Sequence, residues 1–292
     1  MLSPYLPEDF DAFWEEATAE ADGVSVDFER RKTTMQNLPE HEVELIDFLG
    51  MAGSRLHGWI AIPRENPAPG FLWIPAYGHE SHLPNEYSTR LGMASMSFNL
   101  HGHGAFHQEE YTPARGYFAQ GIEDPRTWIF RSMAQNCLVA MRVLQAQPEA
   151  GNLSAAGLSQ GGGMAIWTAA HSPLAKNVVA DLPFLSAMRD TLGKEVYRYP
   201  LKEVADFAAT IPSGMERVLR SVSYFDTVNQ ATRLKVATLV SLGKKDPAVR
   251  ADNVRAVYEA IPSQKKLFEY ETGHDWNPAM IDADRDWMLT EV

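Results

Sequence analysis

The chain of 292 residues is long enough to bury a large core, and its composition, 45% hydrophobic and 22% charged, is typical of a globular protein. With 38 acidic against 26 basic residues, its net charge of −12 argues against nucleic acid or an anionic membrane surface as partner. The single cysteine, Cys137, excludes an internal disulfide and a cysteine-based zinc site. Because we find neither a signal-peptide pattern nor 18 consecutive apolar residues, we expect a cytoplasmic protein without a membrane-spanning helix.

The hydrophobic pattern predicts helices alternating with strands. Apolar residues at helical spacing open the chain at Phe10, Phe13, Trp14 and Ala17. Further along, the pattern predicts a hairpin of 41–50 and 55–63, helices at 128–145 and 252–262, and strand runs at 70–78, 93–104, 176–185, 236–246 and 265–275. This alternation predicts a single α/β domain over 1–292, with a mostly parallel sheet covered by helices on both faces and an N-terminal helix-plus-strand extension.

The motif "GLSQG" at 157–161 places one serine between glycines where a strand-like run meets a helix. The spacing predicts a nucleophile elbow, a turn so sharp that only glycine fits on either side, although a tight loop is the alternative interpretation. The chain continues in the order Ser159, Asp246, His274, with the last two following strand-like runs. That order is the one found in α/β hydrolases, so we expect that fold and a serine hydrolase.

The chemistry requires these residue types. A serine hydroxyl is a poor nucleophile at neutral pH, so a neutral imidazole, here that of His274, takes its proton as it attacks. Asp246 would hold the ring in the required tautomer and stabilise the imidazolium. Asp181 also follows a strand and remains an alternative acid. The oxyanion would be bound by the backbone N–H of Gln160 and by that of Tyr77 or Gly78.

Three histidines, at 101, 103 and 107, suggest either metal ligands or an ordinary turn, and we favour the turn. His79 and His82 either line the pocket or face solvent. The insertion 184–228 reads as mostly helical and is expected to form a cap over the pocket. Large side chains next to proposed catalytic elements, Tyr77, Phe184 and Trp276, are candidates to close an acyl pocket.

Several uncommon strings resemble carbohydrate esterase family seven, the acetyl xylan esterases and cephalosporin-C deacetylases. They run nearly end to end: "DFDAFWEE", "WIPAYGHES", "GIEDPRTWIFR", "GLSQGGG", "ADLPFL" and "SVSYFDTVN". The resemblance implies that Ser159, Asp246 and His274 form the triad and that Tyr77 and Gln160 lie at the oxyanion hole. It also implies a homo-oligomer, a hexamer of paired trimers in that family.

The chain departs from the family pattern at "HGH" (101–103), where arginine-glycine-glutamine is usual, and at Asp275, where glutamate is usual. We therefore expect a cofactor-free and metal-free serine esterase that releases small acyl groups, mainly acetyl, from a small-molecule sugar or alcohol ester. A peptidase or lactonase on the same fold is one alternative, and a non-catalytic binding protein is the other. The sequence leaves the natural substrate open.

Overall fold

A computed structural model describes residues 5–36, 38–64, 68–78, 83–107, 116–194, 196 and 198–290. Within these ranges the centre is a nine-stranded sheet in the order β1-β2-β3-β5-β4-β6-β7-β8-β9. From β5 through β4 to β9 the neighbouring strands are parallel, whereas β1, β2, β3 and β5 pair antiparallel with one another. The strands are β1 Phe28–Lys32, β2 His41–Leu49, β3 Arg55–Pro63, β4 Ala68–Ile74, β5 Ala94–Phe98, β6 Ala150–Leu158, β7 Ala175–Asp181, β8 Ala237–Gly243 and β9 Lys265–Tyr270.

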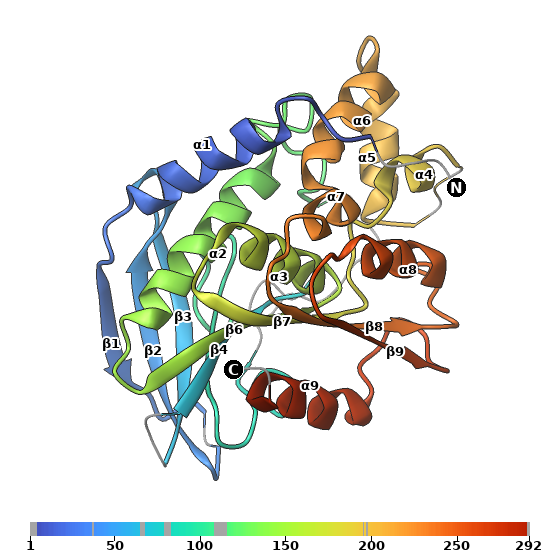
Figure 1. The fold of residues 1–292 in the computed structure, drawn as a ribbon. Coiled ribbons are helices and arrows are strands. Elements are labelled where there is room, and N and C mark those ends of the chain that lie inside the picture. Colours follow the sequence, from blue (N-terminus) through green and yellow to red (C-terminus); the bar gives the residue numbers. More distant parts are fainter. Residues whose placement is uncertain are drawn as a thin grey trace.

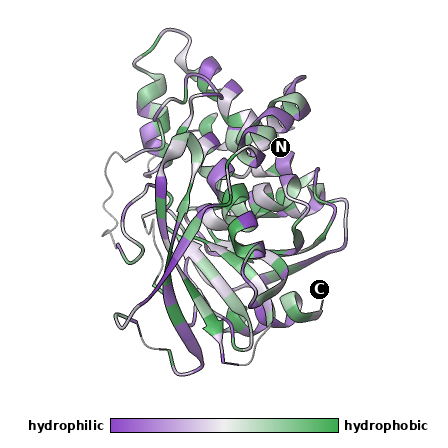
Figure 2. Cartoon of the chain, turned by 90° about the vertical axis from the view of Figure 1, so that its left-hand side faces the viewer, coloured by the Kyte–Doolittle hydropathy of each residue, from purple (hydrophilic) through white to green (hydrophobic). Residues whose placement is uncertain are grey.

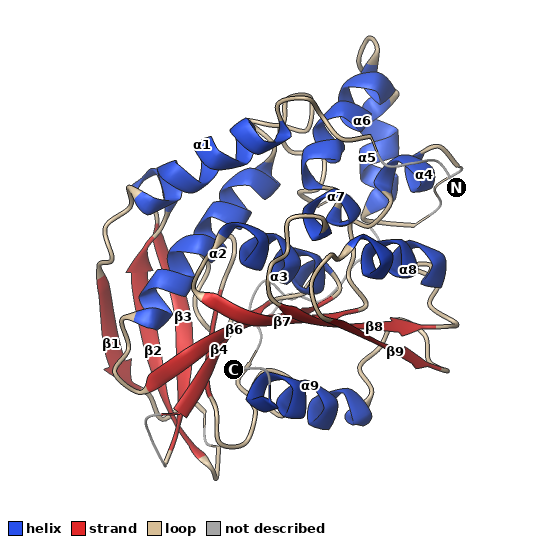
Figure 3. Ribbon diagram, in the orientation of Figure 1, coloured by secondary structure: helices blue, strands red, loops and turns tan. Residues whose placement is uncertain are grey.

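Helices lie on both faces of the sheet, as Figures 1 and 3 show: α2, α3 and α8 cover one face, α1 packs on α2, and α9 lies on the other face. The helices are α1 Phe10–Asp22, α2 Ile129–Gln145, α3 Gln160–His171, α4 Met188–Leu192, α5 Leu201–Ala208, α6 Gly214–Phe225, α7 Thr227–Ala231, α8 Ala251–Ala260 and α9 Pro278–Thr290, with a short 3₁₀ turn η1 at Met51–Gly53. The predicted mostly parallel sheet between two helical layers is confirmed. None of the helices in the described ranges has the length and hydrophobicity needed to cross a bilayer.

The hydrophobic core lies around the central strands. All five residues of β5 and six of the seven residues of β4 are buried, whereas edge strand β1 has none. Figure 2 shows the same contrast, with green hydrophobic segments on the inner strands and purple hydrophilic ones along the edge. In α1, the predicted apolar face is buried: Phe10, Phe13, Trp14 and Ala17 are each at most 2% exposed.

Parallel register brings the carboxyl ends of three strands together. Leu158 at the end of β6 lies opposite Asp181 of β7, which lies opposite Ser241 of β8. Ligands of open α/β sheets bind just beyond such carboxyl ends. A ligand site is therefore expected among the loops that follow β4, β6, β8 and β9.

Candidate active site

Ser159 occupies a strained turn between β6 and α3. Its φ of 56° and ψ of −117° lie outside the usual regions for a residue with a side chain, at a cost of about 1–3 kcal/mol. The surrounding backbone holds this conformation, because the Ser159 N–H donates to the carbonyl oxygen of Asp181 (2.8 Å) and its carbonyl oxygen accepts from Phe184 (2.9 Å). The turn thereby presents the hydroxyl at the carboxyl edge of the sheet.

The glycines of the motif are there because the backbone segments approach closely. A Cβ atom on Gly161 would lie 1.9 Å from the carbonyl oxygen of Ile74, and one on Gly157 would lie 2.5 Å from the carbonyl carbon of Gly161. These contacts pack the start of α3 against the end of β4. They also hold the loop that follows Ile74 beside the N-terminus of α3, where an oxyanion would be bound.

Two hydrogen bonds connect Ser159, His274 and Asp246. The serine Oγ lies 2.8 Å from Nε2 of His274, and Nδ1 of the same ring lies 2.6 Å from Oδ2 of Asp246. Because a carboxylate can only accept, Nδ1 carries the proton and Nε2 is the acceptor for the serine hydroxyl. The structure thus brings together all three residues of the predicted triad, in the tautomer that proton abstraction from serine needs.

The loop after β8 fixes the orientation of Asp246. Its Oδ1 accepts two backbone hydrogen bonds, from Ala248 N (2.7 Å) and Val249 N (2.9 Å). The side chain is only 1% exposed, whereas that of His274 is 24% exposed. The carboxylate is therefore rigidly held from one side, and the imidazole remains accessible from the cavity.

The alternative acid, Asp181, belongs to a separate buried cluster. Its Oδ1 accepts a 2.5 Å hydrogen bond from Ser241 Oγ, and its carboxyl group also contacts that of Asp284 on α9. Asp284 Oδ2 in turn accepts from Arg90 Nη2 at 2.6 Å, and burial raises the pKa of Asp284 well above its ordinary value. Asp181 thus faces the α9 side of the sheet, while Asp246 contacts His274.

The predicted oxyanion residues lie next to the serine. Gln160 is the first residue of α3, so its N–H is one of the four that have no acceptor within the helix. Its side-chain Oε1 accepts a 2.8 Å hydrogen bond from Tyr117 Oη, which fixes the side chain. Tyr77, in the loop after β4, lines the same cavity as Ser159, so the geometry is compatible with both predicted donors.

A cavity of about 430 Å³ opens over the serine. Its lining includes the predicted residues Tyr77, Phe184 and Trp276, together with residues that the sequence did not indicate. The full lining is Ala76, Tyr77, Leu158, Ser159, Phe184, Tyr199, Pro200, Ala248, His274, Asp275 and Trp276. The ring of Trp276 stacks on that of Tyr87, with centroids 4.4 Å apart. His79, the fourth residue predicted to touch substrate, lies outside the described residues, as does His82.

Sequence reasoning missed Tyr199 and Pro200 as cavity residues. Both belong to the insertion 184–228, which contributes Phe184 as well and contains α4, α5 and α6. Their position depends on how the insertion packs on the loop after β8. No local spacing or motif signals that arrangement.

The histidines of the segment 101–107 lie in a turn organised by Asn99. The Oδ1 atom of Asn99 accepts hydrogen bonds from the backbone N–H groups of His101 (2.9 Å) and His103 (3.0 Å). The rings of His103 and His107 stack at 4.5 Å. Among the residues that the structure describes, no group of three histidine, cysteine or acidic side chains is arranged to hold a metal ion.

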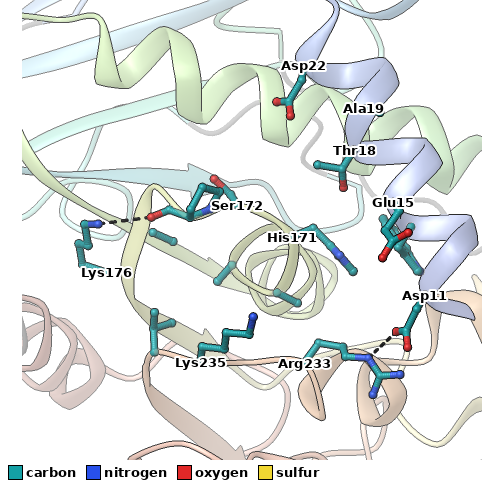
Figure 4. A pocket seen from close by; sticks show the side chains of 16 residues that line it. Asp11, Glu15, Thr18, Ala19, Asp22, His171, Ser172, Lys176, Arg233 and Lys235 are labelled. Carbon is teal, nitrogen blue, oxygen red and sulfur yellow. Dashed lines mark hydrogen bonds and ion pairs between the residues drawn. The ribbon is translucent and has the colours of Figure 1, made fainter.

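A larger cavity, about 790 Å³, lies near the amino ends of the strands, between α1 and the starts of β7 and β8 (Figure 4). Acidic side chains of α1 face basic ones across it, and Arg233 Nε binds Asp11 Oδ1 at 2.7 Å. Ser159, Asp246 and His274 do not line this cavity. Its size alone therefore does not make it the reaction site.

A mostly parallel sheet with a serine at the strand-to-helix turn defines an α/β hydrolase, as the sequence predicted. The chain belongs to the family described as Acetyl xylan esterase (AXE1), whose model matches residues 2–288. The structure is similar to that of the acetyl xylan esterase from Paenibacillus sp. R4, with a TM-score of 0.88 and 23% identity over 99% of this chain and 97% of that chain.

Two further comparisons agree with this assignment. Acetyl Xylan Esterase 1 from Thermoanaerobacterium sp. JW/SL YS485 is similar, with a TM-score of 0.83 and 25% identity over 98% of this chain and 95% of that chain. Acetyl esterase Axe7A of Xylanibacter ruminicola is 22% identical over 94% of this chain. The chain spans 65% of the length of this curated relative. The resemblance to the acetyl xylan esterases is thus confirmed.

Proposed function

We propose that the protein is a serine esterase that removes small acyl groups, mainly acetyl, from esters of sugars or related alcohols. The observation that carries the proposal is the pair of hydrogen bonds from Ser159 through His274 to Asp246. Membership in the acetyl xylan esterase family supports the ester as the bond cleaved and acetyl as the acyl group.

In this mechanism, Ser159 Oγ attacks the ester carbonyl carbon while Nε2 of His274 accepts the hydroxyl proton. Asp246 stabilises the imidazolium, and the backbone N–H groups of Gln160 and Tyr77 bind the oxyanion, each contributing about 3–4 kcal/mol to transition-state stability. The imidazolium then protonates the leaving alcohol. Water, deprotonated by His274, hydrolyses the acyl-enzyme in the second half, so the cycle needs no cofactor.

Preference for small acyl groups would follow from the bulky walls of the cavity. Phe184 is only 6% exposed, and Trp276 stacks on Tyr87, so packing restricts the movement of both rings. Tyr77 and His79 are proposed to complete the substrate contacts. A closed wall disfavours long chains by steric overlap, which costs more than the loss of apolar contact.

The remaining proposals concern organisation. We propose one domain over 1–292 in which 184–228 forms a cap, and the cavity lining by Phe184, Tyr199 and Pro200 supports the cap. A cytoplasmic location and a homo-oligomer, as in the family's hexamers, complete the proposal. The net charge of −12 supports a small-molecule substrate in preference to nucleic acid.

The test is hydrolysis of 4-nitrophenyl acetate by the wild type, Ser159→Ala and the control Ser132→Ala, an exposed serine of α2. We expect Ser159→Ala to lose about 10⁵- to 10⁶-fold in kcat while the control keeps wild-type activity. An anilide analogue, 4-nitroacetanilide, distinguishes a peptidase, which would cleave it efficiently. Wild-type protein that is folded but inactive on the ester would instead favour a non-catalytic binding protein.

A further inference from the structure

A second cavity adjoins the one over Ser159. It has a volume of about 280 Å³, and it shares four lining residues with the catalytic cavity: Phe184, Tyr199, Pro200 and Ala248. These shared side chains form the boundary between the two spaces. The two cavities are therefore adjacent, and a group that extends from an ester at Ser159 would have to pass Tyr199, Pro200 and Ala248 to enter the second one.

The second cavity is lined by three cationic side chains, Lys194, Arg198 and Arg250, and its described lining contains no acidic residue. They come from three places in the fold: the loop after α4, the segment before α5 and the residue before α8. These helices lie together in Figure 1. This local charge is opposite in sign to the net charge of the chain, −12. The positive lining is thus a property of this site and not of the surface as a whole.

One carboxylate behind the lining compensates only part of this charge. Asp190 Oδ2 accepts hydrogen bonds from Lys194 Nζ (2.7 Å) and from Arg250 Nη2 (2.6 Å). Arg198 is exposed, and the described part of the chain gives its guanidinium no ion pair. Among the residues that the structure describes around this cavity, three cations against one anion leave an excess of two positive charges.

We propose that this second cavity binds an anionic group, a carboxylate or a phosphate, carried by the alcohol part of the ester substrate. The inference rests on the proposed esterase function and extends it to the leaving group. Guanidinium and ammonium groups bind carboxylate and phosphate oxygens through charge-assisted hydrogen bonds. An acetyl group ends one carbon beyond the ester carbonyl, so the alcohol part is the portion of the substrate that can reach the cations.

Asp275 adds to the preference for one orientation of an anionic substrate. It is exposed and lines the catalytic cavity next to His274, on a different loop from the three cations. An anionic substituent near Asp275 would be repelled, whereas the same substituent near Arg198 would be attracted. The charge distribution therefore favours one orientation of an acetylated sugar acid or sugar phosphate, with its anion turned to the second cavity.

The experiment compares acetate release from three acetylated sugars: methyl glucoside (neutral), methyl glucuronide (carboxylate) and glucose 6-phosphate (phosphate). We expect kcat/KM for at least one anionic ester to exceed that of the neutral ester about tenfold at low salt, mainly through KM, and the preference to shrink with added salt. Comparison of the glucuronide ester with the glucose 6-phosphate ester shows whether the cavity prefers a carboxylate or a phosphate. Equal kcat/KM values for all three, or a preference for the neutral ester, would overturn the proposal.

Arg198→Gln is the decisive variant, because Arg198 has no described ion pair whose loss would disturb the fold. The anionic-to-neutral ratio should fall about three- to tenfold in this variant. The matched control, Lys235→Gln, removes an exposed cation in the distant cavity of Figure 4 and should keep the wild-type ratio. An unchanged ratio in Arg198→Gln, or an equal fall in the control, would contradict the proposal.

A binding measurement separates this proposal from the esterase assignment. Calorimetry with methyl glucuronide and with glucose 6-phosphate on Ser159→Ala reports the anion site without any turnover. Binding of either sugar to this variant, weakened by adding Arg198→Gln, would support the site even if the wild type failed on 4-nitrophenyl acetate. Hydrolysis of 4-nitrophenyl acetate without such binding would leave the esterase standing and remove the anion site.

Discussion

Asp181 and Ser241, at the ends of neighbouring strands β7 and β8, are joined by a 2.5 Å hydrogen bond from the serine hydroxyl to the aspartate carboxylate. This contact, together with Asp284, holds Asp181 on the α9 side of the sheet. Asp246 follows β8 by a short loop and instead lies 2.6 Å from the imidazole of His274. Two acids at the same edge of the sheet thus have different surroundings and should have different roles.

Replacement of the two acids should therefore give opposite results. Asp246→Asn should lower kcat by about 10⁴-fold, because the amide stabilises the wrong tautomer of His274 and cannot stabilise the imidazolium. Asp181→Asn should reduce activity far less and should mainly change stability, since it alters the buried cluster with Arg90 and Asp284. Ester hydrolysis and thermal unfolding of both variants test this, and the reverse ranking in folded protein would make Asp181 the catalytic acid.

The sequence predicted this site well where the signal was local. The glycines around Ser159 are required by contacts with β4 and within the turn itself, so the motif carries the geometry in five consecutive residues. The hairpin of β2 and β3 followed from simple alternation. By contrast, the sequence left Asp181 and Asp246 as alternatives, because both follow strands and only their tertiary surroundings separate them.

Two elements without a clear hydrophobic pattern were not predicted. β1 is an edge strand, "FERRK", of which no residue is buried, so no alternation with a buried face marks it. α9 places a carboxylate, Asp284, at a buried position, where its partner is Arg90, 194 residues away in the sequence. A charged residue inside the apolar face interrupts the helical pattern, and the compensating partner is visible only in three dimensions.

Acyl chain length should affect turnover strongly. With 4-nitrophenyl esters of two to eight carbons, we expect acetyl to be preferred over butyryl and octanoyl to be at least about 100-fold poorer in kcat/KM, because Phe184 and Trp276 close the cavity. Phe184→Ala should shift the preference toward longer chains. Rates that stay level or rise toward octanoyl in the wild type would contradict an acetyl esterase and leave the serine mechanism intact.

Gly161→Ala should strongly destabilise the folded protein. In an ordinary helix, alanine in place of glycine stabilises by about 1 kcal/mol. Here the added methyl would lie 1.9 Å from the Ile74 carbonyl oxygen, and overpacking against fixed backbone costs about 3 kcal/mol or more. Gly104→Ala, where a Cβ meets nothing within 4 Å, is the control. The free energy of unfolding of both variants, measured with denaturant, tests this prediction. A value for Gly161→Ala equal to that of the wild type would refute the packing argument.

Chelation should leave activity unchanged. The turn at 101–103 is held by Asn99 through backbone hydrogen bonds, so its conformation needs no bound ion. We expect the same rate of 4-nitrophenyl acetate hydrolysis before and after incubation with EDTA, followed by dialysis. Loss of activity that a divalent metal restores would show that these histidines, or others outside the described residues, hold a metal.

His171 should make the protein less stable in mild acid. Its ring stacks on Trp14 at 4.4 Å, its Nε2 lies 2.7 Å from Gln230 Oε1, and burial lowers its pKa to about 4. Gln230 Nε2 donates to the carbonyl oxygen of Tyr224, so Oε1 faces the histidine and requires an N–H there. The folded protein therefore contains a neutral imidazole with Nε2 protonated.

Because an unfolded histidine has a pKa of about 6.5, the unfolded state binds the extra proton first as the pH falls. The stability contributed by neutral His171 is thus fully present above about pH 6.5 and is lost progressively down to about pH 4, by about 3 kcal/mol in total. Asp226, whose pKa burial raises to about 6, has the opposite effect on the pH dependence of stability, so only a comparison of variants isolates the contribution of the histidine.

Urea unfolding between pH 4 and 7.5 tests this. The free energy of unfolding should fall less steeply toward acid pH in His171→Gln than in the wild type. The exposed control His103→Gln should follow the wild type, and parallel curves for all three proteins would exclude His171 as the cause.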